Sequence, residues 1–410
     1  MRTLGAASMA VTAFPGLAAV PNGPLPPRPQ GPNAIGIGPI EMDSDIVTIS
    51  MNENPLGPAP AAVEAVRAVA GVANRYHHEF TQQAVNTIID QFGMKHGYVG
   101  LFPGSAGALN LALLSNIGPG KPLVYGDPSY EMVTDTAAFV NAPTFAVKLT
   151  PAYAHDVRAM VKATPNAGAY YIVNPNNPTG TMTSKADIAW LVDNQPKGSV
   201  VIVDEAYHHF SNDESSIDLV AKDQDVIVMR TFSKIYGMAG IRAGFAIGRP
   251  DLLQKFQTVA PAGRSLASIS IVSAAAARAS LQDKELVPLR RKINGDVREE
   301  TLAFMQKKGY KVIPGSQANF FMVDTGVTQY GVPGGGPLQK AMLAEKVSIG
   351  RAWKSMPTYV RVTVGTKEEM AKFQTAFVKC MDHTDVVSSA SLHMPEYHIP
   401  TELYRGEMFA

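Results

Sequence analysis

Short apolar runs alternate with helix-like segments along the chain from about residue 46 onward. The runs that we expect to be strands are Val99–Phe102, Leu123–Tyr125, Ala169–Val173, Val200–Asp204, Val226–Thr231 and Gly244–Ile247. The helix-like segments between them include Ala106–Ser115, Glu131–Phe139 and Lys185–Asn194. Ser184 is placed to cap the last of these helices. Strands that alternate with helices in this way indicate an α/β fold with a parallel sheet.

The chain beyond these strands predicts a second, smaller domain. A long helical stretch from about Ser268 to Lys308 is expected to leave the sheet, and Asn319–Asp324 and Val360–Val364 are expected strands beyond it. A length of 410 residues also favours two domains over one core. We expect an N-terminal arm at 1–45, a large domain at 46–285, a small α+β domain at 286–384 and a C-terminal extension at 385–410.

Composition excludes several classes of protein. Hydrophobic residues make up 46% of the chain and charged residues 17%, which is typical of a globular protein. The 36 basic and 35 acidic residues leave a formal net charge of +1, so no nucleic-acid partner is expected. The single cysteine, Cys380, excludes an internal disulfide framework and a cysteine-rich metal site. The body of the chain has no run of about 18 apolar residues, so no membrane insertion is expected.

The first residues leave two interpretations open. Met1 and Arg2 precede a run of small and mildly apolar residues from Thr3 to Val20, and a proline-rich stretch follows. This order resembles a signal peptide, although Pro15 interrupts the apolar run. The other interpretation is an arm without a targeting role. We expect a cytoplasmic protein, or a periplasmic one if this segment is a signal peptide.

Three polar motifs begin at or just after the ends of predicted strands. They are Asn174–Gly180, Asp204–Tyr207 and Ser233–Gly240. In open α/β sheets, ligands bind outside the carboxyl ends of the strands. We therefore expect the three motifs to converge on one site.

Lys234 is the residue of these motifs whose amine could act as a nucleophile. It directly follows a buried strand and lies among small and apolar residues, where the pKa of an amine is easily lowered. A lysine that forms a Schiff base needs such a lowered pKa. Ser233 and Arg242 supply a hydroxyl and a guanidinium suited to a phosphate. A surface lysine and arginine beside a glycine-rich turn would have the same pattern, and the motif alone favours that interpretation.

The other two motifs shift this balance. The carboxylate of Asp204 emerges at the end of an apolar strand, where it could keep a pyridine nitrogen protonated or cap a helix. Tyr207 could reach a ring hydroxyl or serve as a packed aromatic. Two Asn-Pro steps within Asn174–Gly180 forbid helix and central strand, and the amide of Asn177 can bind a phenolate oxygen.

Together these motifs resemble the hallmark motifs of fold-type I, class I/II aminotransferases. The most similar subgroup is the histidinol-phosphate aminotransferase-like proteins, because Asn52–Pro58 and Arg361–Thr366 resemble its N-terminal and C-terminal signatures. The resemblance runs from about Ile46 to Asp382. It implies an aspartate-aminotransferase-like fold with a mostly parallel mixed sheet, and a homodimer with shared active sites. It also implies pyridoxal 5'-phosphate as cofactor, and no metal.

The resemblance implies a role for each matching residue. Lys234 would carry the cofactor as a Schiff base and move a proton, with Asp204 and Tyr207 completing the catalytic set. The further residues implied at the cofactor are Ser105, Ala106, Tyr130, Asn177, Thr231, Ser233, Arg242 and, across the dimer interface, Tyr76. The residues implied at the substrate are Asn54, Asn177, Arg351 and Arg361. Arg361 could instead be a structural ion-pair partner, and Tyr76 an ordinary surface tyrosine.

The implied reaction is ping-pong transamination between an L-amino acid, or an amine such as histidinol phosphate, and a 2-oxo acid. A decarboxylase or lyase of the same fold would share the cofactor contacts, and a binding protein without turnover is a third possibility. Two departures put the substrate in doubt. Ala106 stands where the subgroup usually has an acidic residue, and His77-His78-Glu79 follows Tyr76 where Pro and an acidic residue are common.

Overall fold

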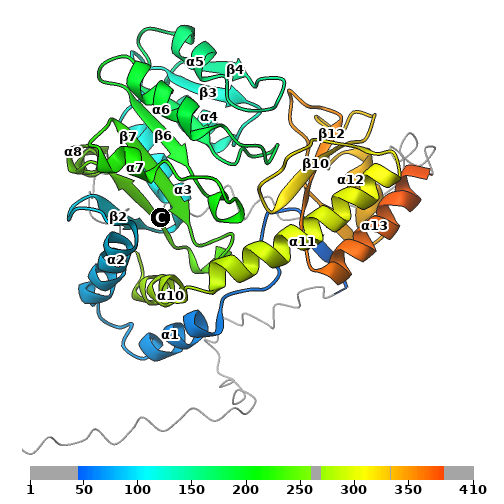
Figure 1. Cartoon of the computed structure of the whole chain (residues 1–410), viewed down its shortest axis with the longest axis horizontal. Coiled ribbons are helices and arrows are strands. Elements are labelled where there is room, and N and C mark those ends of the chain that lie inside the picture. The colour runs from blue at the N-terminus through cyan, green and yellow to red at the C-terminus, as the bar shows by residue number, and fades with distance from the viewer. Residues whose placement is uncertain (1–44, 260–268, 333, 383–410) are drawn as a thin grey trace, which may run out of the picture. The chain divides into compact units, whose positions relative to one another are not determined.

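The computed structural model describes residues 45–259, 269–332 and 334–382 (Figure 1). The N-terminal segment with its two interpretations and the C-terminal extension lie outside the described residues. Within the described ranges, no helix has the length and apolar character needed to cross a membrane.

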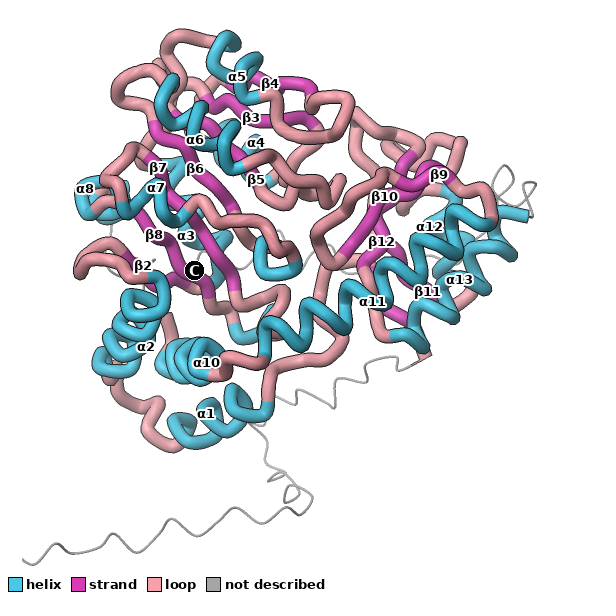
Figure 2. Tube along the Cα trace, in the orientation of Figure 1, coloured by secondary structure: helices cyan, strands magenta, loops and turns pink. Residues whose placement is uncertain are grey.

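A seven-stranded sheet forms the centre of the larger part of the chain (Figures 1 and 2). In spatial order its strands are β2 (Val99–Phe102), β8 (Gly244–Gly248), β7 (Val226–Thr231), β6 (Val200–Asp204), β5 (Ala169–Val173), β3 (Leu123–Asp127) and β4 (Thr144–Lys148). Strand β8 runs antiparallel to both neighbours, whereas the other pairs are parallel. The predicted α/β fold with a mostly parallel mixed sheet is confirmed.

Helices cover both faces of this sheet, as Figures 1 and 2 show. They are α2 (His78–Phe92), α3 (Gly104–Leu114), α4 (Met132–Phe139), α5 (Val157–Ala163), α6 (Lys185–Asn194), α7 (Ile217–Ala221), α8 (Pro250–Gln254), α9 (Phe256–Val259) and α10 (Ile271–Gln282), with 3-10 turns η1 (His208–Phe210) and η2 (Ala239–Ile241). Helix α1 (Pro60–Ala70) packs against α10. Successive residues of β5 enter cores on opposite faces: Tyr170 joins one and Tyr171 the other. Strands buried on both faces are apolar throughout, which is why β5 and β6 are evident from the sequence.

The helical stretch expected from Ser268 to Lys308 consists of two helices. Its first residue lies outside the described residues, α10 ends at Gln282, and α11 (Leu286–Lys307) begins three residues after Asp283. The Oδ1 of Asp283 accepts a hydrogen bond from the backbone N–H of Glu285 at 3.2 Å. This side-chain bond competes with the helical hydrogen bond and explains the break.

A smaller part of the chain is built on two short sheets. Strands β9 (Lys311–Val312), β10 (Phe320–Asp324) and β12 (Tyr359–Thr363) form an antiparallel sheet, and β1 (Val47–Ile49) pairs in parallel with β11 (Val347–Ile349). Helices α12 (Pro337–Ala344) and α13 (Lys367–Asp382) pack beside them. After β1 the chain leaves this part: Asn52 bonds both Thr363 on β12 and Tyr207 in the larger part. The domain boundaries expected at 285 and 384 stay predictions.

Candidate active site

The three polar motifs follow the carboxyl ends of adjacent parallel strands. Strand β6 lies between β5 and β7, and Asp204 is opposite Val173 on one side and Met229 on the other. The backbone N–H of Asn174 donates to the carbonyl of Asp204 at 2.8 Å, and that of Glu205 donates to Met229 at 2.8 Å. The structure therefore brings the three motifs to one edge of the sheet.

The amine of Lys234 lies in the loop after β7. Its Nζ donates to the carbonyl of Met51 at 3.2 Å and lies 5.6 Å from the centre of the Tyr207 ring. Burial lowers the pKa of Lys234 to about 8, and the positive charges of Arg361 and Arg242 act in the same direction. Within the described part of the chain, no carboxylate forms an ion pair with Nζ. At pH 7 about a tenth of this amine is therefore neutral and nucleophilic, far more than for an exposed lysine.

Asp204 is a buried carboxylate, with 4% of the residue exposed. Its Oδ2 accepts from the hydroxyl of Tyr171 at 3.1 Å, and its Oδ1 accepts from the backbone N–H of Ala206 at 3.0 Å. Burial raises the pKa of Asp204 to about 6, against the effect of these hydrogen bonds. A carboxyl so placed is ionised most readily beside a cationic partner, such as a protonated ring nitrogen.

Tyr207 is both packed and hydrogen-bonded. Its ring meets Phe320 edge-on at 4.9 Å between centres, and its hydroxyl oxygen accepts from Nδ2 of Asn52 at 3.0 Å. Burial raises the pKa of Tyr207 to about 12, so the hydroxyl keeps its proton at neutral pH. Its O–H is available to donate to a ligand oxygen. The packed-aromatic interpretation and the ligand-binding one are therefore compatible.

Arg361, on β12, is a buried guanidinium whose neighbours are neutral. Nη1 donates to Oδ1 of Asn177 at 2.7 Å and Nη2 to the carbonyl of Ser50 at 2.9 Å. The buried Nε has no hydrogen-bond partner, and the group lies 5.3 Å from the ring centre of Trp353. No carboxylate in the described ranges pairs with Arg361, so nothing there supports the structural ion-pair interpretation. Burial lowers the pKa of Arg361 to about 10, which still leaves it charged at pH 7.

The start of α3 and the loop after β7 form a cradle that suits an anion. A Cβ built on Gly104 would come within 2.6 Å of Nη2 of Arg242, and one on Gly244 within 2.2 Å of the backbone nitrogen of Ser105. Only glycine permits such close approaches. The first N–H groups of α3 have no partner within the helix and attract anions. Ser233 and Thr231 add hydroxyl groups 3.0 Å apart, so the donors fit a phosphate.

Tyr130 and Ala106 belong to the same region. Tyr130 is partly buried, and its pKa is raised first by burial and then by the nearby negative charge of Asp204. Ala106 lies in the first turn of α3. Their positions agree with a ring contact and a phosphate contact, and both roles stay predictions.

The remaining predicted residues lie elsewhere or have other partners. Tyr76 is 87% exposed in the single chain, and its ring stacks on that of His78 at 6.0 Å between ring centres. The amide of Asn54 donates to the carbonyl of Ile235 at 3.0 Å and accepts from the N–H of Leu56 at 3.0 Å, so it fastens the segment after β1 to the Lys234 loop. Arg351 forms an ion pair with Glu131.

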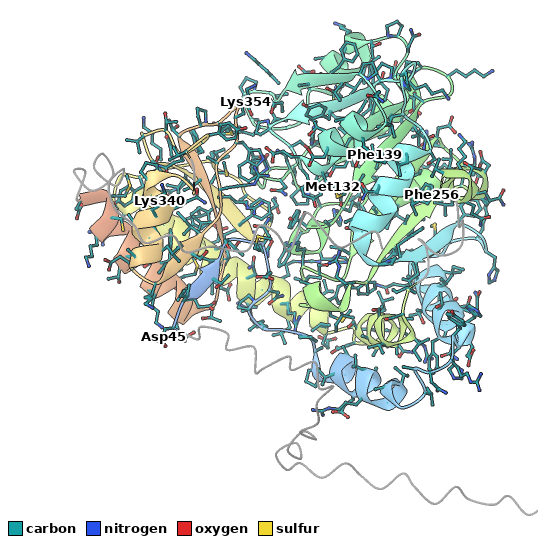
Figure 3. The ribbon with its side chains drawn as sticks, turned by 180° about the vertical axis from the view of Figure 1, so that it is seen from behind. Asp45, Met132, Phe139, Phe256, Lys340 and Lys354 are labelled. Carbon is teal, nitrogen blue, oxygen red and sulfur yellow. The ribbon has the colours of Figure 1, made fainter. Side chains whose placement is uncertain are left out.

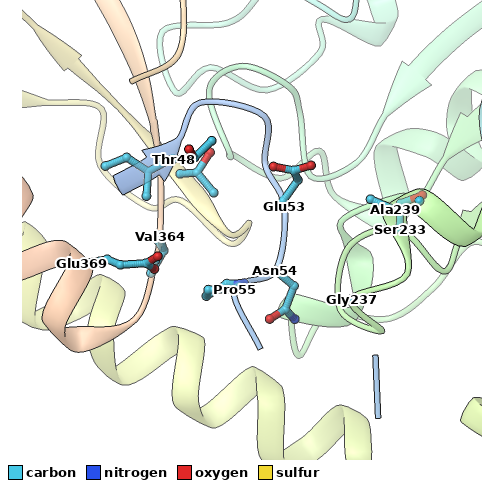
Figure 4. A pocket seen from close by; sticks show the side chains of 13 residues that line it. Thr48, Glu53, Asn54, Pro55, Ser233, Gly237, Ala239, Val364 and Glu369 are labelled. Atoms are coloured by element: carbon cyan, nitrogen blue, oxygen red, sulfur yellow. The ribbon is translucent and has the colours of Figure 1, made fainter. Parts of the chain in front are cut away.

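A cavity of about 310 Å³ adjoins the Lys234 loop (Figure 4). Its walls come from the segment after β1, the loop after β7 and the start of α13, and include Glu53, Asn54, Ser233, Thr363 and Glu369. Lys234, Asp204 and Tyr207 do not line it. We therefore assign the chemistry to the buried side chains at the strand ends and treat this polar cavity as their neighbour.

A buried ion pair supports the site from behind. Glu205 accepts from Nε and Nη2 of Arg230 at 2.9 and 2.7 Å, and the two side chains are 1% and 7% exposed. Nη1 of Arg230 lies 3.1 Å from Nε2 of His209, which must accept and so be neutral; burial also lowers its pKa. His209 packs on Tyr236, two residues from Lys234. This network joins the Asp204 segment to the Lys234 loop.

Several residues of the site were not identified from the sequence. Asn52 lies within the N-terminal signature, which supplies a signal, but only Asn54 was selected there. Tyr171 lies opposite Ile202 on a neighbouring strand, so the alternation of strand residues would have placed its hydroxyl near Asp204. Trp353 and Glu131 carry no such signal, because both lie in loops far apart in the sequence.

Fold and site together define an α/β enzyme that can bind amines and carboxylates. Lys234, whose pKa is lowered, and the buried Arg361, which has no acidic partner among the described residues, lie at the same edge of the sheet. The sequence comparison gives the family. A model described as aminotransferase class I and II matches residues 44–377, and the chain belongs to this family. The predicted resemblance is confirmed.

Similar proteins include enzymes with two kinds of amino donor in their names. The histidinol-phosphate aminotransferase of Symbiobacterium thermophilum is 32% identical over 81% of this chain and 90% of its own length. The aromatic amino acid aminotransferase of Cutibacterium acnes is 33% identical over 68% and 79%. The crystal structure of histidinol-phosphate aminotransferase from Sinorhizobium meliloti, in complex with pyridoxal-5'-phosphate, has a TM-score of 0.73 at 22% identity, covering 82% of this chain and 91% of that one.

Proposed function

We propose that this aminotransferase uses pyridoxal 5'-phosphate to move an amino group between an L-amino acid, or a related amine such as histidinol phosphate, and a 2-oxo acid in a ping-pong reaction. The observation that carries the proposal is the buried guanidinium of Arg361. Its Nε lacks a partner and no described carboxylate pairs with it. A substrate α-carboxylate, or the phosphate that stands in its place in histidinol phosphate, would supply both in a charge-assisted pair.

The side chains at the strand ends fit the cofactor from both ends. When bound, its ring supplies a sink for the electrons of the bond broken at the substrate Cα. The carboxylate of Asp204 would hold the proton on the ring nitrogen. Tyr207 would donate its O–H to the ring oxygen, and Asn177, whose Oδ1 already accepts from Arg361, would present its amide N–H groups. Ser233, Arg242 and the start of α3 would bind the phosphate.

Lys234 would do two things in turn. Its neutral amine would hold the cofactor between reactions, because burial lowers the pKa to about 8. Once a substrate amine displaces it, Nζ would take the proton from the substrate Cα and return it to the adjoining cofactor carbon. An amine with a pKa near the working pH is suited to accept and to donate a proton.

Donor assays with the cofactor-loaded protein test this proposal. L-phenylalanine and L-histidinol phosphate would be supplied with and without 2-oxoglutarate. Without 2-oxoglutarate we expect at most one molecule of oxo product per active site. With 2-oxoglutarate we expect repeated turnover that yields the oxo product of the donor and an equal amount of glutamate. Carbon dioxide release independent of 2-oxoglutarate would instead identify a decarboxylase. A loaded protein that converts no amine would contradict the proposal.

We also propose a homodimer in which Tyr76 of one subunit approaches the phosphate of the cofactor bound to the partner subunit. The support is the 87% exposure of a large aromatic side chain in the single chain. A molar mass of one chain in light scattering would contradict it. The cellular location, cytoplasmic or periplasmic, stays a prediction, and N-terminal sequencing of the mature protein from its native cell would decide it.

A further inference from the structure

Asn52 lies where the segment after β1 reaches the site. Figure 3 shows Asp45, two residues before β1, at the smaller part of the chain. Asn52 is 1% exposed, and its φ of 55° lies in the left-handed region, which asparagine adopts more readily than most residues. The residue before it, Met51, accepts at its carbonyl from Nζ of Lys234 at 3.2 Å. Two consecutive residues of this segment therefore contact Lys234 and Tyr207.

The hydrogen bonds of Asn52 set the direction of each donor. The hydroxyl of Thr363, on β12, accepts from the backbone N–H of Asn52 at 2.9 Å and donates to its Oδ1 at 3.1 Å. Because Oδ1 accepts this bond, the other end of the amide is Nδ2, which donates to the Tyr207 oxygen at 3.0 Å. The Tyr207 oxygen is thus an acceptor here, and its own proton finds no acceptor among the described residues.

The smaller part of the chain holds Asn52 in this orientation. Nδ2 of Asn319, which directly precedes β10, donates to the carbonyls of Asn52 and Glu53 at 3.1 and 3.2 Å. Asn319 and Thr363 are both buried, so water does not compete for these bonds. Strand β12 carries Arg361 as well as Thr363. The strand that holds the proposed carboxylate-binding group is therefore joined through Asn52 to the tyrosine on the cofactor side.

We propose, resting on the proposed function, that Asn52 is a positioning residue: its amide occupies the oxygen of Tyr207 as a donor and so directs the Tyr207 O–H to the ring oxygen of the cofactor. Thr363, Asn52 and Tyr207 then form one chain of donors that ends at the site. Hydrogen bonds in such a chain polarise one another, which strengthens the last one. Burial has the largest effect on the pKa of Tyr207 and raises it, whereas the bond from Asn52 acts to lower it.

This chain of donors acts on the nitrogen of Lys234 when that nitrogen is joined to the cofactor. A negative ring oxygen favours a proton on the nitrogen, and a hydrogen bond from Tyr207 to that oxygen weakens the effect. Loss of the bond should therefore raise the pH at which the nitrogen loses its proton. The other charged or titratable groups that act on the pKa of Tyr207 or Lys234 are Asp204, Arg361, Arg242, Glu53 and Tyr130.

The experiment is a pH titration of the visible absorption of the cofactor-loaded protein, with all of those other groups left in place. The variants are Asn52→Gly, Thr363→Val, Thr363→Ser, Tyr207→Phe and the double variant Asn52→Gly/Tyr207→Phe. Glycine is chosen at position 52 because it adopts a positive φ without strain. Asn116 is also buried, but its amide donates to Ser115 and to the carbonyl of Ala112, so Asn116→Ala is the matched control.

We expect the midpoint to rise by about 1.5 pH units in Tyr207→Phe, about 1 unit in Asn52→Gly and about 0.5 unit in Thr363→Val. Thr363→Ser, which keeps the hydroxyl, and Asn116→Ala should stay within about 0.2 unit of the parent. The double variant should match Tyr207→Phe alone, because Asn52 acts through the Tyr207 hydroxyl. If Asn52 only stabilised the fold, its loss would lower the free energy of unfolding without moving the midpoint.

An unchanged midpoint in Asn52→Gly would overturn the inference. A lowered midpoint would do so as well, because Tyr207 would then give its proton to Asn52 in the parent. Equal shifts from Asn52→Gly with and without the Tyr207 hydroxyl would also contradict it. If Asn52→Gly does not fold, the difference between Thr363→Val and Thr363→Ser decides in its place.

The titration needs no substrate, so it separates this inference from the proposed function. A parent that binds the cofactor but converts no amine would overturn the proposed function, and the titration would still decide the role of Asn52 toward Tyr207. A parent that binds no cofactor would overturn both.

Discussion

Two glutamate–arginine pairs flank the site, and they differ in almost every physical respect. Glu205–Arg230 lies behind the cofactor side, is nearly inaccessible to solvent, and is held by further bonds from Ser215 and Ser216. Glu131–Arg351 lies on the proposed substrate side and is close to half exposed. The first joins the strand ends to the loops that follow them, whereas the second is accessible to solvent.

The two pairs show that the cofactor side and the proposed substrate side are assembled in different ways. The cofactor side is assembled from strand ends and buried side chains, where small displacements are costly and partners are fixed. The substrate side is assembled from loops with exposed charges, where an altered residue changes the partner without disturbing the sheet. Related enzymes can therefore share the cofactor chemistry while they differ in the donor.

The largest loss of activity is expected on the cofactor side, for Lys234→Ala. Without the amine, the protein loses both the attachment of the cofactor and the group that moves the proton. We expect kcat to fall by ~10⁴-fold, because the loss of proton transfer costs about 10²–10⁴-fold and the attachment of the cofactor is lost as well. Steady-state assays with phenylalanine and 2-oxoglutarate would measure it. Activity within tenfold of the parent would show that another group does this chemistry.

The buried pair is tested through stability. Glu205→Gln leaves Arg230 charged and buried, so we expect the free energy of unfolding to fall by about 3–5 kcal/mol. Urea unfolding followed by circular dichroism would measure it. A loss of unfolding free energy below about 1 kcal/mol would mean that Glu205–Arg230 behaves like a surface pair, and it would contradict the difference between the two pairs.

Asp204→Asn should change activity and stability in opposite directions. The folded-state pKa of about 6 lies above the ordinary 3.8, so Asp204 lowers the stability of the cofactor-free protein as the pH rises from 3.8 through 6. Replacement should therefore stabilise the cofactor-free protein at pH 7 by about 2–3 kcal/mol and leave it unchanged near pH 3.5. Loss of the partner of the ring nitrogen should lower kcat by ~10²–10³-fold. Paired unfolding curves at the two pH values, with rate assays, would check both; a stability loss at pH 7 would be the contrary result.

The Glu131–Arg351 pair should contribute least to the free energy of unfolding. In Glu131→Gln we expect a change in unfolding free energy below about 1 kcal/mol, because exposed ion pairs contribute little and salt screens them. Urea curves at low and high ionic strength, beside those of Glu205→Gln, would measure the difference between the same substitution in the two regions. A loss of several kcal/mol would assign Glu131 a structural role.

The strands and motifs of the cofactor side could be located from the sequence, whereas the pairing of loops on the proposed substrate side could not, and the reason is physical. Strands β5 and β6 are uniformly apolar because both faces are buried, so their ends and the motifs that follow could be located. Strand β4 alternates exposed and half-buried positions at the sheet edge, and it was missed.

Long-range pairing in loops leaves no local pattern. Arg351 was identified only through family resemblance, and its partner Glu131 stands 220 positions earlier in another loop. The structure reveals this pairing because the two loops meet beside Trp353. The role of Tyr76 depends on a partner chain and stays a prediction.

The central claim is that the amine of Lys234 holds the cofactor at the carboxyl edge of the sheet. Reduction of the loaded protein with borohydride, followed by proteolysis and mass spectrometry of the peptides, tests it directly. The account predicts one reduced cofactor per chain, attached to the peptide that contains Lys234. Attachment at another lysine, or a Lys234 peptide without added mass in a protein that keeps its visible absorption, would contradict it.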